Sequence, residues 1–250
     1  MGGIKGIVLC GGKGTRLRPL TYYIQKTMVP VGLKQKPLLE YVVRLFRFHG
    51  IENLVFLVNY KSEQIMNYFE DGSRFGVNIT YVEDDASSKG TGGAVLTAYN
   101  KGALDNEDTL LVYYGDIITN MNLANLLNYH HEKQAWTTVA LASGFKVRVG
   151  VATLNSVGKI SAFEEKPTLE KPVSIGISVL NGKLLAKMKL LKGDKPELDF
   201  MGEVLPHLLN AGEPVYGYVS KAFWYDVLST EALEKLDPQL VDDMFKEILQ

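Results

Sequence analysis

The sequence predicts an α/β fold whose central sheet is mixed but mostly parallel. In the first half of the chain, short apolar runs alternate with amphipathic stretches, which is the pattern of repeated strand–helix–strand units. Four runs are apolar enough for strands buried on both faces, as in a parallel sheet, and they cover residues 4–9, 54–58, 79–82 and 110–114. The 250 residues are 46% hydrophobic, so we expect one core and a single domain over residues 1–250, although this length also allows two small domains.

The stretches between these runs are expected to be crossover helices, at residues 38–48, 63–69 and 93–101. Apolar residues recur there every three or four positions, which gives each helix one apolar face to pack on the sheet. After Asp116 the pattern loosens and indicates a mixed rather than purely parallel half. The elements expected there are a helix at 123–132, strands at 136–142, 149–154, 159–163 and 175–180, a helix at 202–210, a strand at 215–219, and terminal helices at 230–236 and 238–249. No hexapeptide repeat is present, so no left-handed β-helix domain is expected.

Charge and cysteine content narrow the class of protein. The 27 basic and 28 acidic side chains give a net charge of -1, which provides no broad electrostatic surface for nucleic acid or an anionic membrane. The apolar run near the N-terminus is too short for a signal peptide or a membrane span. Cys10 is the only cysteine, which excludes an intramolecular disulfide and fits a reducing compartment. We therefore expect a cytoplasmic protein that binds neither nucleic acid nor a membrane.

A glycine-rich loop directly after the first expected strand is the strongest functional signal. It reads GGKGTRLRPLT over residues 11–21, and its glycines let backbone N–H groups approach a phosphate closely. A dinucleotide-binding Rossmann loop would need a glycine where Leu17 stands, and a Walker loop fails because Lys13 is followed by Gly14. The loop predicts a phosphate site of another kind, with Arg16 and Arg18 adding charge, although an ordinary turn would explain the glycines alone.

Further motifs follow this loop in order along the chain. Together they resemble the signature of the sugar-1-phosphate nucleotidylyltransferase family, which includes mannose- and heptose-1-phosphate guanylyltransferases and glucose-1-phosphate thymidylyltransferases. The resemblance implies the family's modified Rossmann-like, three-layer fold, with a family core over about residues 4–236. The segments that carry it are 11–21, 26–31, 36–41, 89–94, 114–116, 163–167 and 224–226.

The reaction that the resemblance implies joins a nucleoside triphosphate (NTP) and a sugar 1-phosphate, giving a nucleotide sugar and pyrophosphate. A phosphate oxygen of the sugar attacks the α-phosphate in line. Two anions must meet, and like charges about 4 Å apart repel by roughly 4 kcal/mol near a protein surface, so fixed cations are needed. The catalytic residues implied are Arg16, Lys26 and Lys166. The implied nucleotide-binding residues are Leu9, Gly11, Gly12, Gly14, Thr15, Arg16, Gly90 and Thr91, and those for the sugar phosphate are Gly150, Glu165, Lys166 and Gly176.

Asp116 and Asp226 are the carboxylates that the resemblance assigns to a metal, which would be Mg²⁺. Asp116 follows a buried strand, and the carboxyl ends of parallel strands characteristically carry ligand contacts. Mg²⁺ prefers oxygen ligands and keeps several waters, so two carboxylates and the substrate's phosphate oxygens suffice to hold it.

The chain departs from the family pattern at three places. Gln25 and Thr27 flank Lys26 where the family usually has two prolines, which removes two rigid φ values. Ser174 stands where many relatives have an asparagine that meets the sugar. The residues after Asp226 lack the usual Gly-Thr, so the backbone near this carboxylate could run differently from that of the relatives.

Several alternatives stay open at the level of sequence. The segment 90–93 favours guanylyl transfer, with uridylyl, thymidylyl and cytidylyl transfer also open. A non-catalytic paralogue that binds nucleotide sugars is the second hypothesis, and a nicotinamide-dependent enzyme is disfavoured by the missing glycine. Cys10 and the four histidines are expected to be structural. An apolar stripe over residues 240–249 either covers the core or meets another subunit, so a homo-oligomer is left open.

Overall fold

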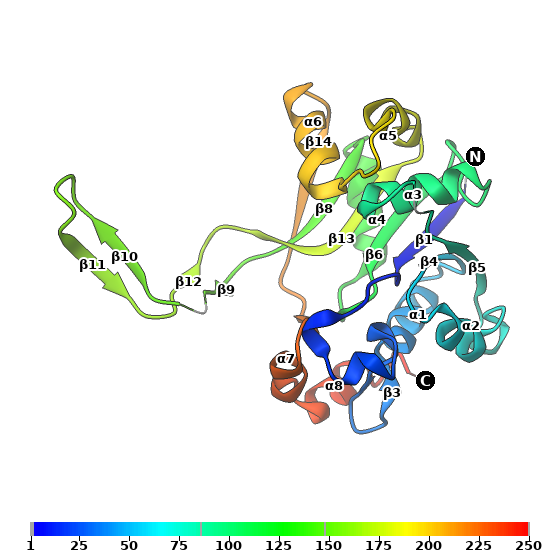
Figure 1. Cartoon of the computed structure of the whole chain (residues 1–250), viewed down its shortest axis with the longest axis horizontal. Coiled ribbons are helices and arrows are strands. Elements are labelled where there is room, and N and C mark those ends of the chain that lie inside the picture. Colours follow the sequence, from blue (N-terminus) through cyan, green and yellow to red (C-terminus); the bar gives the residue numbers. More distant parts are fainter. Residues whose placement is uncertain (1–2, 86, 148, 250) are drawn as a thin grey trace.

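The fold is organised around a seven-stranded sheet with the strand order β14-β8-β13-β6-β1-β4-β5 (Figure 1). The structure is a computed structural model, and it describes residues 3–85, 87–147 and 149–249. Neighbouring strands are parallel except in the two pairs that contain β13, so the expected mixed, mostly parallel sheet is confirmed. The strands are β1 (Ile4–Leu9), β4 (Asn53–Val58), β5 (Asn78–Glu83), β6 (Thr109–Tyr114), β8 (Thr137–Ala142), β13 (Val173–Asn181) and β14 (Val215–Ser220).

Helices cover both faces of this sheet, which gives three layers (Figure 1). Along β1, Val8 belongs to the core on one face and Ile7 to the core on the other, because successive side chains of a strand point to opposite faces. The Val8 face packs against α1 (Leu38–Phe48), α2 (Ser62–Phe69), α4 (Leu123–Glu132), α7 (Thr230–Lys235) and α8 (Pro238–Met244). The Ile7 face packs against α3 (Gly90–Asn100), α5 (Leu184–Lys192), the π-helix η5 (Phe200–Val204) and α6 (Leu205–Asn210).

Some expected elements differ in extent or burial. The helix expected at 202–210 is the π-helix η5 followed by α6, and the helix expected at 238–249 ends at Met244. The expectation that strand 79–82 is buried on both faces is wrong, because β5 is the edge strand and its residues are mostly exposed or half-buried. Within the described ranges, the helices are all too short or too polar to cross a bilayer.

A ribbon that we call the arm, residues 145–169, leaves the sheet between β8 and β13 and projects away from the rest of the chain (Figure 1). Its stem pairs β9 (Phe145–Lys146) with β12 (Thr168–Leu169), and its outer part pairs β10 (Val151–Leu154) with β11 (Ile160–Glu164). Residue 148 lies outside the described ranges. The strands expected at 149–154 and 159–163 therefore form a hairpin that is separate from the central sheet.

Short elements occupy the loops at the carboxyl ends of the parallel strands. β7 (Ile117–Thr119) pairs antiparallel with β15 (Trp224–Asp226), which brings a late segment of the chain beside the end of β6. The remaining short elements are the 3-10 helices η1 (Thr15–Leu17), η2 (Leu20–Tyr22), η3 (Lys26–Met28) and η4 (Ser73–Phe75), and the strands β2 (Pro30–Val31) and β3 (Lys36–Pro37).

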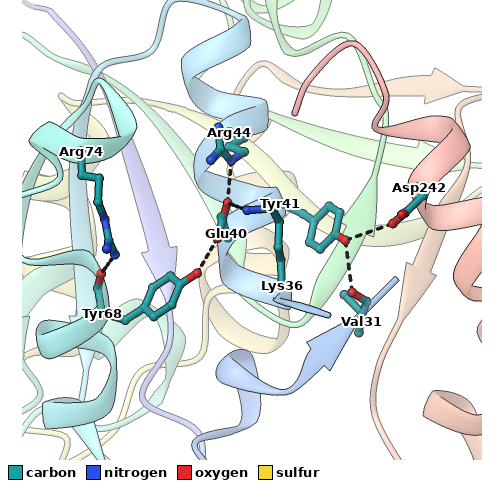
Figure 2. Close-up of polar contacts among 8 residues, drawn as sticks. All are labelled: Val31, Lys36, Glu40, Tyr41, Arg44, Tyr68, Arg74 and Asp242. Atoms are coloured by element: carbon teal, nitrogen blue, oxygen red, sulfur yellow. Dashed lines mark hydrogen bonds and ion pairs between the residues drawn. The ribbon is translucent and has the colours of Figure 1, made fainter. Parts of the chain in front are cut away.

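A buried carboxylate ties α1 to its neighbours (Figure 2). Glu40 is only 1% exposed and accepts hydrogen bonds from Lys36 Nζ at 2.6 Å, Arg44 Nε at 2.7 Å and Tyr68 Oη at 2.5 Å. Burial alone would raise the pKa of Glu40, but these three donors outweigh it and lower the pKa below its usual value of 4.5. Since Tyr68 belongs to α2, the network fixes α2 against α1.

The C-terminal helix is held against the same part of the fold by Tyr41, the next residue of α1 (Figure 2). The Tyr41 hydroxyl donates to the carbonyl of Val31 at 3.1 Å and lies 3.4 Å from Asp242 Oδ1 of α8. The ring of Tyr41 meets that of Phe245 edge-on, with centroids 5.0 Å apart. The apolar stripe expected over residues 240–249 thus covers the core through Val241 and Phe245.

We predict that Glu40→Gln lowers the free energy of unfolding by about 1–3 kcal/mol at pH 7, because the buried charge that accepts hydrogen bonds from three partly buried donors is lost. A group whose pKa is lowered by folding contributes stability above its unfolded pKa of about 4.5 and loses that contribution as the pH falls through the folded pKa. The difference between wild type and variant should therefore shrink as urea unfolding is repeated from pH 7 toward pH 4. The exposed Glu234→Gln is the matched control, and equal losses in both variants would contradict the role of Glu40.

Candidate active site

The glycine-rich loop turns sharply at the carboxyl end of β1. Gly14 has a φ of 59°, in the left-handed region that favours glycine, and the carbonyl of Gly14 accepts a 2.8 Å hydrogen bond from Thr21 Oγ1. A Cβ on Gly14 would lie 2.9 Å from the Thr21 methyl and 3.0 Å from Lys26 Cβ. The loop can therefore pass this close to Lys26 only with glycine at position 14.

A buried glutamine, Gln25, holds the segment around Lys26, where the family usually has two prolines and this chain has none. Gln25 is fully buried, and its side-chain amide donates to the carbonyl of Cys10 at 2.5 Å. Its side-chain oxygen accepts from both the backbone N–H and the hydroxyl of Thr27, at 2.5 and 2.7 Å. Gln25 and Thr27 thus replace the fixed φ values of proline with a closed set of hydrogen bonds. Apart from their positions beside Lys26, nothing in the local sequence pattern indicates this role.

Lys26 forms an ion pair with Asp116, and both side chains are less than a fifth exposed. Asp116 follows β6, which is parallel to β1 with Leu9 opposite Tyr114, so the two loops leave the sheet at the same edge. The backbone N–H of Gly115 donates to the carbonyl of Leu9 at 3.1 Å and links the loops further. The structure thus brings two predicted catalytic and metal-binding residues into direct contact.

Asp226 is placed beside Asp116 by the pairing of β15 with β7. Asp226 lies opposite Ile117, the residue after Asp116, and the N–H of Val227 donates to the carbonyl of Asp116 at 3.1 Å. The backbone after Asp226 is therefore hydrogen-bonded to the Asp116 segment even though the Gly-Thr of the family pattern is absent. The two carboxylates predicted to bind a metal come from segments that lie side by side.

Two hollows adjoin at Leu9, which lines both. The loop hollow, of about 170 Å³, is lined by Leu9, Cys10, Gly12, Gly14, Thr15, Arg16, Gln25, Lys26, Thr27, Asp116 and Leu228. The apolar cavity, of about 360 Å³, is lined mainly by Leu9, Thr91, Val95, Val112, Tyr114, Ile117, Ser174, Ile175, Gly176, Phe200, Met201, Trp224 and Asp226. The first hollow has fixed positive charges and glycine backbone, whereas the second offers mostly apolar walls with a carboxylate.

The start of α3 forms one wall of the apolar cavity. Gly90 has a φ of 80°, and a Cβ there would lie 2.5 Å from the carbonyl oxygen of Leu198, so this close approach requires glycine. The Thr91 hydroxyl donates to Asp199 at 3.1 Å and accepts from the N–H of Phe200 at 2.9 Å. Gly176 on the facing strand also has a positive φ, of 75°. The structure thus places Thr91 and Gly176 on one cavity.

A third hollow, which we call the acidic hollow, contains a carboxylate that the sequence analysis did not single out. It is lined by Asn59, Asp84, Asp85, Ser88, Lys89 and Gly90. A Cβ on Gly11 would lie 2.6 Å from Asp84 Oδ2, so Asp84 lies directly against the glycine-rich loop. Burial raises the pKa of Asp84, and the hydrogen bond from Asn59 and the charge of Lys101 offset this only in part. The available signal was its place just after strand 79–82, where ligand contacts are common.

Cys10 lies below the loop and is fully buried, with its thiol 3.3 Å from the carbonyl of Val8. Burial, together with the negative charges of Asp116 and Asp84, raises the pKa of Cys10 well above its usual value. The thiol is therefore neutral and poorly nucleophilic at neutral pH, as expected for a structural cysteine.

Three predicted sugar-phosphate residues, Gly150, Glu165 and Lys166, lie on the arm and not in these hollows. Glu165 and Lys166 form a 3.8 Å ion pair, and their side chains are 63% and 65% exposed. A Cβ on Gly150 would lie 2.4 Å from the ring of Phe163 and 2.9 Å from Glu165, so these residues are grouped on the arm. Among the sugar-phosphate predictions, only Gly176 lines the apolar cavity.

The donor set at Asp116 and Asp226 suits Mg²⁺ rather than a metal held by protein alone. Over the described ranges, groups of three or more histidine, cysteine, aspartate or glutamate side chains that could hold a metal are absent. Two carboxylates from neighbouring segments near the glycine-rich loop would leave coordination positions for water and phosphate oxygens, which Mg²⁺ characteristically retains. The residues present therefore fit a magnesium ion that binds together with a phosphorylated substrate.

The chain resembles known proteins over nearly its whole length. It is 32% identical to a UTP–glucose-1-phosphate uridylyltransferase of Synechocystis, covering 90% of this chain and 60% of that protein. It is also 32% identical to a mannose-1-phosphate guanylyltransferase of Mycobacterium tuberculosis, covering 95% of this chain and 65% of that protein. The chain thus spans under two thirds of the length of both relatives.

The same fold occurs in solved structures. A Bacillus anthracis structure assigned as a glucose-1-phosphate thymidylyltransferase, in complex with sucrose, matches with a TM-score of 0.74 and 23% identity over 93% of both chains. HddC from Yersinia pseudotuberculosis, complexed with GMP-PN, matches with a TM-score of 0.70 and 18% identity over 93% of this chain and 97% of that chain. Residues 5–242 match the family model described as nucleotidyl transferase, and the chain therefore belongs to the nucleotidyl transferase family.

Proposed function

We propose that this protein transfers a nucleotidyl group from an NTP to a sugar 1-phosphate in a Mg²⁺-dependent reaction that releases pyrophosphate. The contact between Lys26 and Asp116 carries this proposal, because it places a fixed cation and a carboxylate suited to Mg²⁺ in one hollow with a glycine-rich loop. The chemistry needs no protein nucleophile, since the sugar phosphate itself attacks the α-phosphate. The cytoplasmic location expected from the sequence stays a prediction.

The loop hollow is the proposed site of the triphosphate. Backbone N–H groups around Gly12 and Gly14 can approach phosphate oxygens without interference from side chains. Arg16 and Lys26 line the same hollow and would balance the negative charge of the triphosphate. Without these cations, the approach of a second phosphate to the α-phosphate would be strongly unfavourable.

Asp116 and Asp226 are the proposed magnesium ligands. When bound, Mg²⁺ would supply charge neutralisation at the phosphate oxygens and help to orient the α-phosphate. In the structure, Lys26 takes the position of a counter-ion to Asp116. We expect the Lys26 ammonium to turn to a phosphate oxygen when Asp116 binds the metal. Lys26 would then balance the charge of Asp116 in the empty site and the charge of a phosphate in the substrate-bound site.

The apolar cavity is the proposed site of the sugar. Its volume of about 360 Å³ lies at the lower end of the range for small-molecule sites, and Trp224 and Tyr114 offer aromatic surface for rings to pack on. Lys166 is the proposed cation for the sugar phosphate, with Glu165 accepting hydrogen bonds from sugar hydroxyls. Because Glu165 and Lys166 both lie on the arm, these two roles require an arm to lie close to the apolar cavity.

The acidic hollow favours guanine among the bases used by the relatives, whose names include uridylyl, guanylyl and adenylyl transferases. The two oxygens of the Asp84 carboxylate match the adjacent N1–H and N2–H₂ donors of guanine. Uracil and thymine present only one N–H donor on the corresponding edge, and adenine presents a ring nitrogen acceptor that would repel the carboxylate. Asp84 lies against Gly11 and beside Gly90, which are both proposed nucleotide-binding residues.

We predict that Asp116→Asn lowers kcat by at least about 100-fold, because the variant loses a charged metal ligand while retaining the shape of the side chain. The measurement is pyrophosphate release with Mg²⁺, crossing GTP, UTP, dTTP, CTP and ATP with mannose, glucose, N-acetylglucosamine and heptose 1-phosphates. Asp194→Asn, outside the hollows, is the control and should match wild type. A fully active Asp116→Asn variant would refute the metal assignment. Wild-type protein that binds nucleotide sugars but releases no pyrophosphate with any pair would instead favour the non-catalytic paralogue.

We predict that Asp84→Asn raises the melting temperature at pH 7 and weakens GTP binding by about 10-fold or more. Because folding raises the pKa of Asp84, the ionised carboxylate is disfavoured in the fold, and stability present below the unfolded pKa is lost as the pH rises through the folded pKa. The gain in melting temperature should therefore disappear only as the pH falls below the unfolded pKa of about 3.8, where the carboxyl becomes protonated in both states.

Asp85→Asn is the matched control for this experiment. Hydrogen bonds from Ser87 lower the pKa of Asp85, so its charge is favoured in the fold and the variant should gain no stability. Melting temperatures and binding of GTP and UTP would be compared for both variants. If Asp84→Asn bound GTP as tightly as wild type, this would contradict the proposal that Asp84 recognises the guanine base.

A further inference from the structure

The arm exposes an apolar face that the rest of the described chain leaves uncovered. In β10 and β11 every residue is exposed, and Leu154, Ile160 and Phe163 are 59%, 56% and 63% exposed. Phe163 pairs with Ala152 and Ile160 pairs with Leu154, and paired residues of neighbouring strands share a face. The outer part of the arm therefore presents one apolar face, on a ribbon that projects away from the rest of the chain (Figure 1).

Such a ribbon needs a partner surface. A two-stranded hairpin is marginally stable in water by itself, and contiguous exposed apolar surface on an ordered element marks an interaction site. The arm comprises roughly 25 residues, and a standard interface uses about 20–30 residues from each side. The arm alone is thus large enough to form most of one side of a specific interface.

The chemistry of the arm and of the apolar cavity is complementary. Among the described residues that line the apolar cavity there is no lysine or arginine, although Asp226 is there. The arm carries Lys166 three residues from Phe163, next to its apolar face, and the Lys166 side chain is 65% exposed. A sugar phosphate in the cavity needs a cation beside it, the residues that line the cavity supply none, and the arm carries one.

The stem of the arm directs it away from the chain's own cavity. Val173 pairs with Ala142 at the root, β9 pairs with β12 beyond it, and the N–H of Val147 donates to the carbonyl of Pro167 at 2.8 Å. At the root, β13 enters the cavity wall directly at Ser174, and the arm extends from there away from the rest of the chain (Figure 1). At about 3.3 Å per residue, the roughly nine residues from stem to tip reach about 30 Å, close to the diameter of a small domain. The arm is therefore long enough to reach across a domain of that size.

We propose that two copies of this chain exchange arms, so that the arm of one copy covers the apolar cavity of the other and supplies Lys166 to it. In a two-fold symmetric dimer, each arm covers a cavity and each cavity is covered by an arm, so no further copy is needed. The apolar face of each arm is buried against the other body, and neither cavity is complete without the second copy. The catalytic part of this inference rests on the proposed function, whereas the pairing of the two copies does not.

The pairing is tested by light scattering on the full chain. We expect twice the chain mass for wild type and a single chain mass for the double variant Ile160→Glu/Phe163→Glu, whose altered residues are exposed in the single chain and not needed for its fold. Leu190→Glu, which alters an 83% exposed leucine on α5, is the matched control and should remain a dimer. A monomeric wild type, or a double variant that stays dimeric, would overturn the exchange.

Contact between arm and cavity is tested by replacing Phe163 with a photo-crosslinking amino acid in a mixture of ¹⁴N- and ¹⁵N-labelled chains. Crosslinks between differently labelled chains, to peptides containing Phe200 or Trp224, support the exchange. Crosslinks to those peptides within one chain only would show that the arm folds back on its own cavity. This readout does not depend on activity, so it separates failure of the exchange from failure of the proposed function.

The supply of Lys166 is tested with mixed dimers. Lys166→Ala and Asp116→Asn are co-expressed with different tags and purified through both tags, so that each dimer contains one copy of each variant. With exchanged arms, one cavity combines an intact Asp116 with Lys166 from the other copy, and about half of the wild-type activity should return. Mixed dimers no more active than the two parent variants would overturn the exchange of Lys166.

Discussion

The ion pair between Lys26 and Asp116 is the contact on which the arrangement of the site depends. It joins the segment that follows the glycine-rich loop to the residue after β6, and it does so at the common carboxyl edge of two parallel strands. Both side chains are mostly buried, so the pair is less screened than a surface salt bridge, and loss of either partner would leave a poorly solvated charge. The same contact keeps a cation and a carboxylate within reach of one phosphate group.

The surrounding loop is held in place by hydrogen bonds rather than by rigid residues. Gln25 connects the Lys26 segment to the carbonyl of Cys10 and to Thr27, and it is fully buried. A buried polar side chain is costly unless its partners are present, so this network favours one loop conformation although the two prolines are missing. The departure from the family pattern at Gln25 and Thr27 is therefore compensated locally, within the same turn of chain.

Sequence periodicity predicted the elements whose packing follows from a local pattern. The helix at 38–48 and the strand at 4–9 match the structure in extent, because their apolar residues repeat with the period of the element they form. The arm could not be predicted in this way, since its strands have the same alternating pattern whether they join the central sheet or pair only with each other. The edge position of β5 likewise depends on strand order, which a local pattern does not contain.

The site residues likewise fall into two groups: those that lie in a local sequence motif and those whose role depends on the tertiary structure. Gly14, Lys26 and Asp116 lie in motifs that are recognisable in the chain, and the structure brings them together. Asp84 was missed because its contact with Gly11 arises only when β5 takes its place two strands from β1. Its raised pKa likewise reflects tertiary burial rather than any feature of the surrounding sequence.

Charge is divided between the body of the chain and the arm, and this division bears on how two anions can be joined. With a net charge of -1 the protein has no general positive field, so each phosphate must meet its own local cations. The loop hollow provides them through Arg16 and Lys26, whereas Lys166 is carried on the arm. Under the proposed exchange, a cavity acquires its last cation only when an arm covers it, and the same movement excludes water from the reacting phosphates. A site assembled in this way would favour attack by the sugar phosphate over attack by water. The contact between arm and cavity would both position the sugar phosphate and exclude solvent.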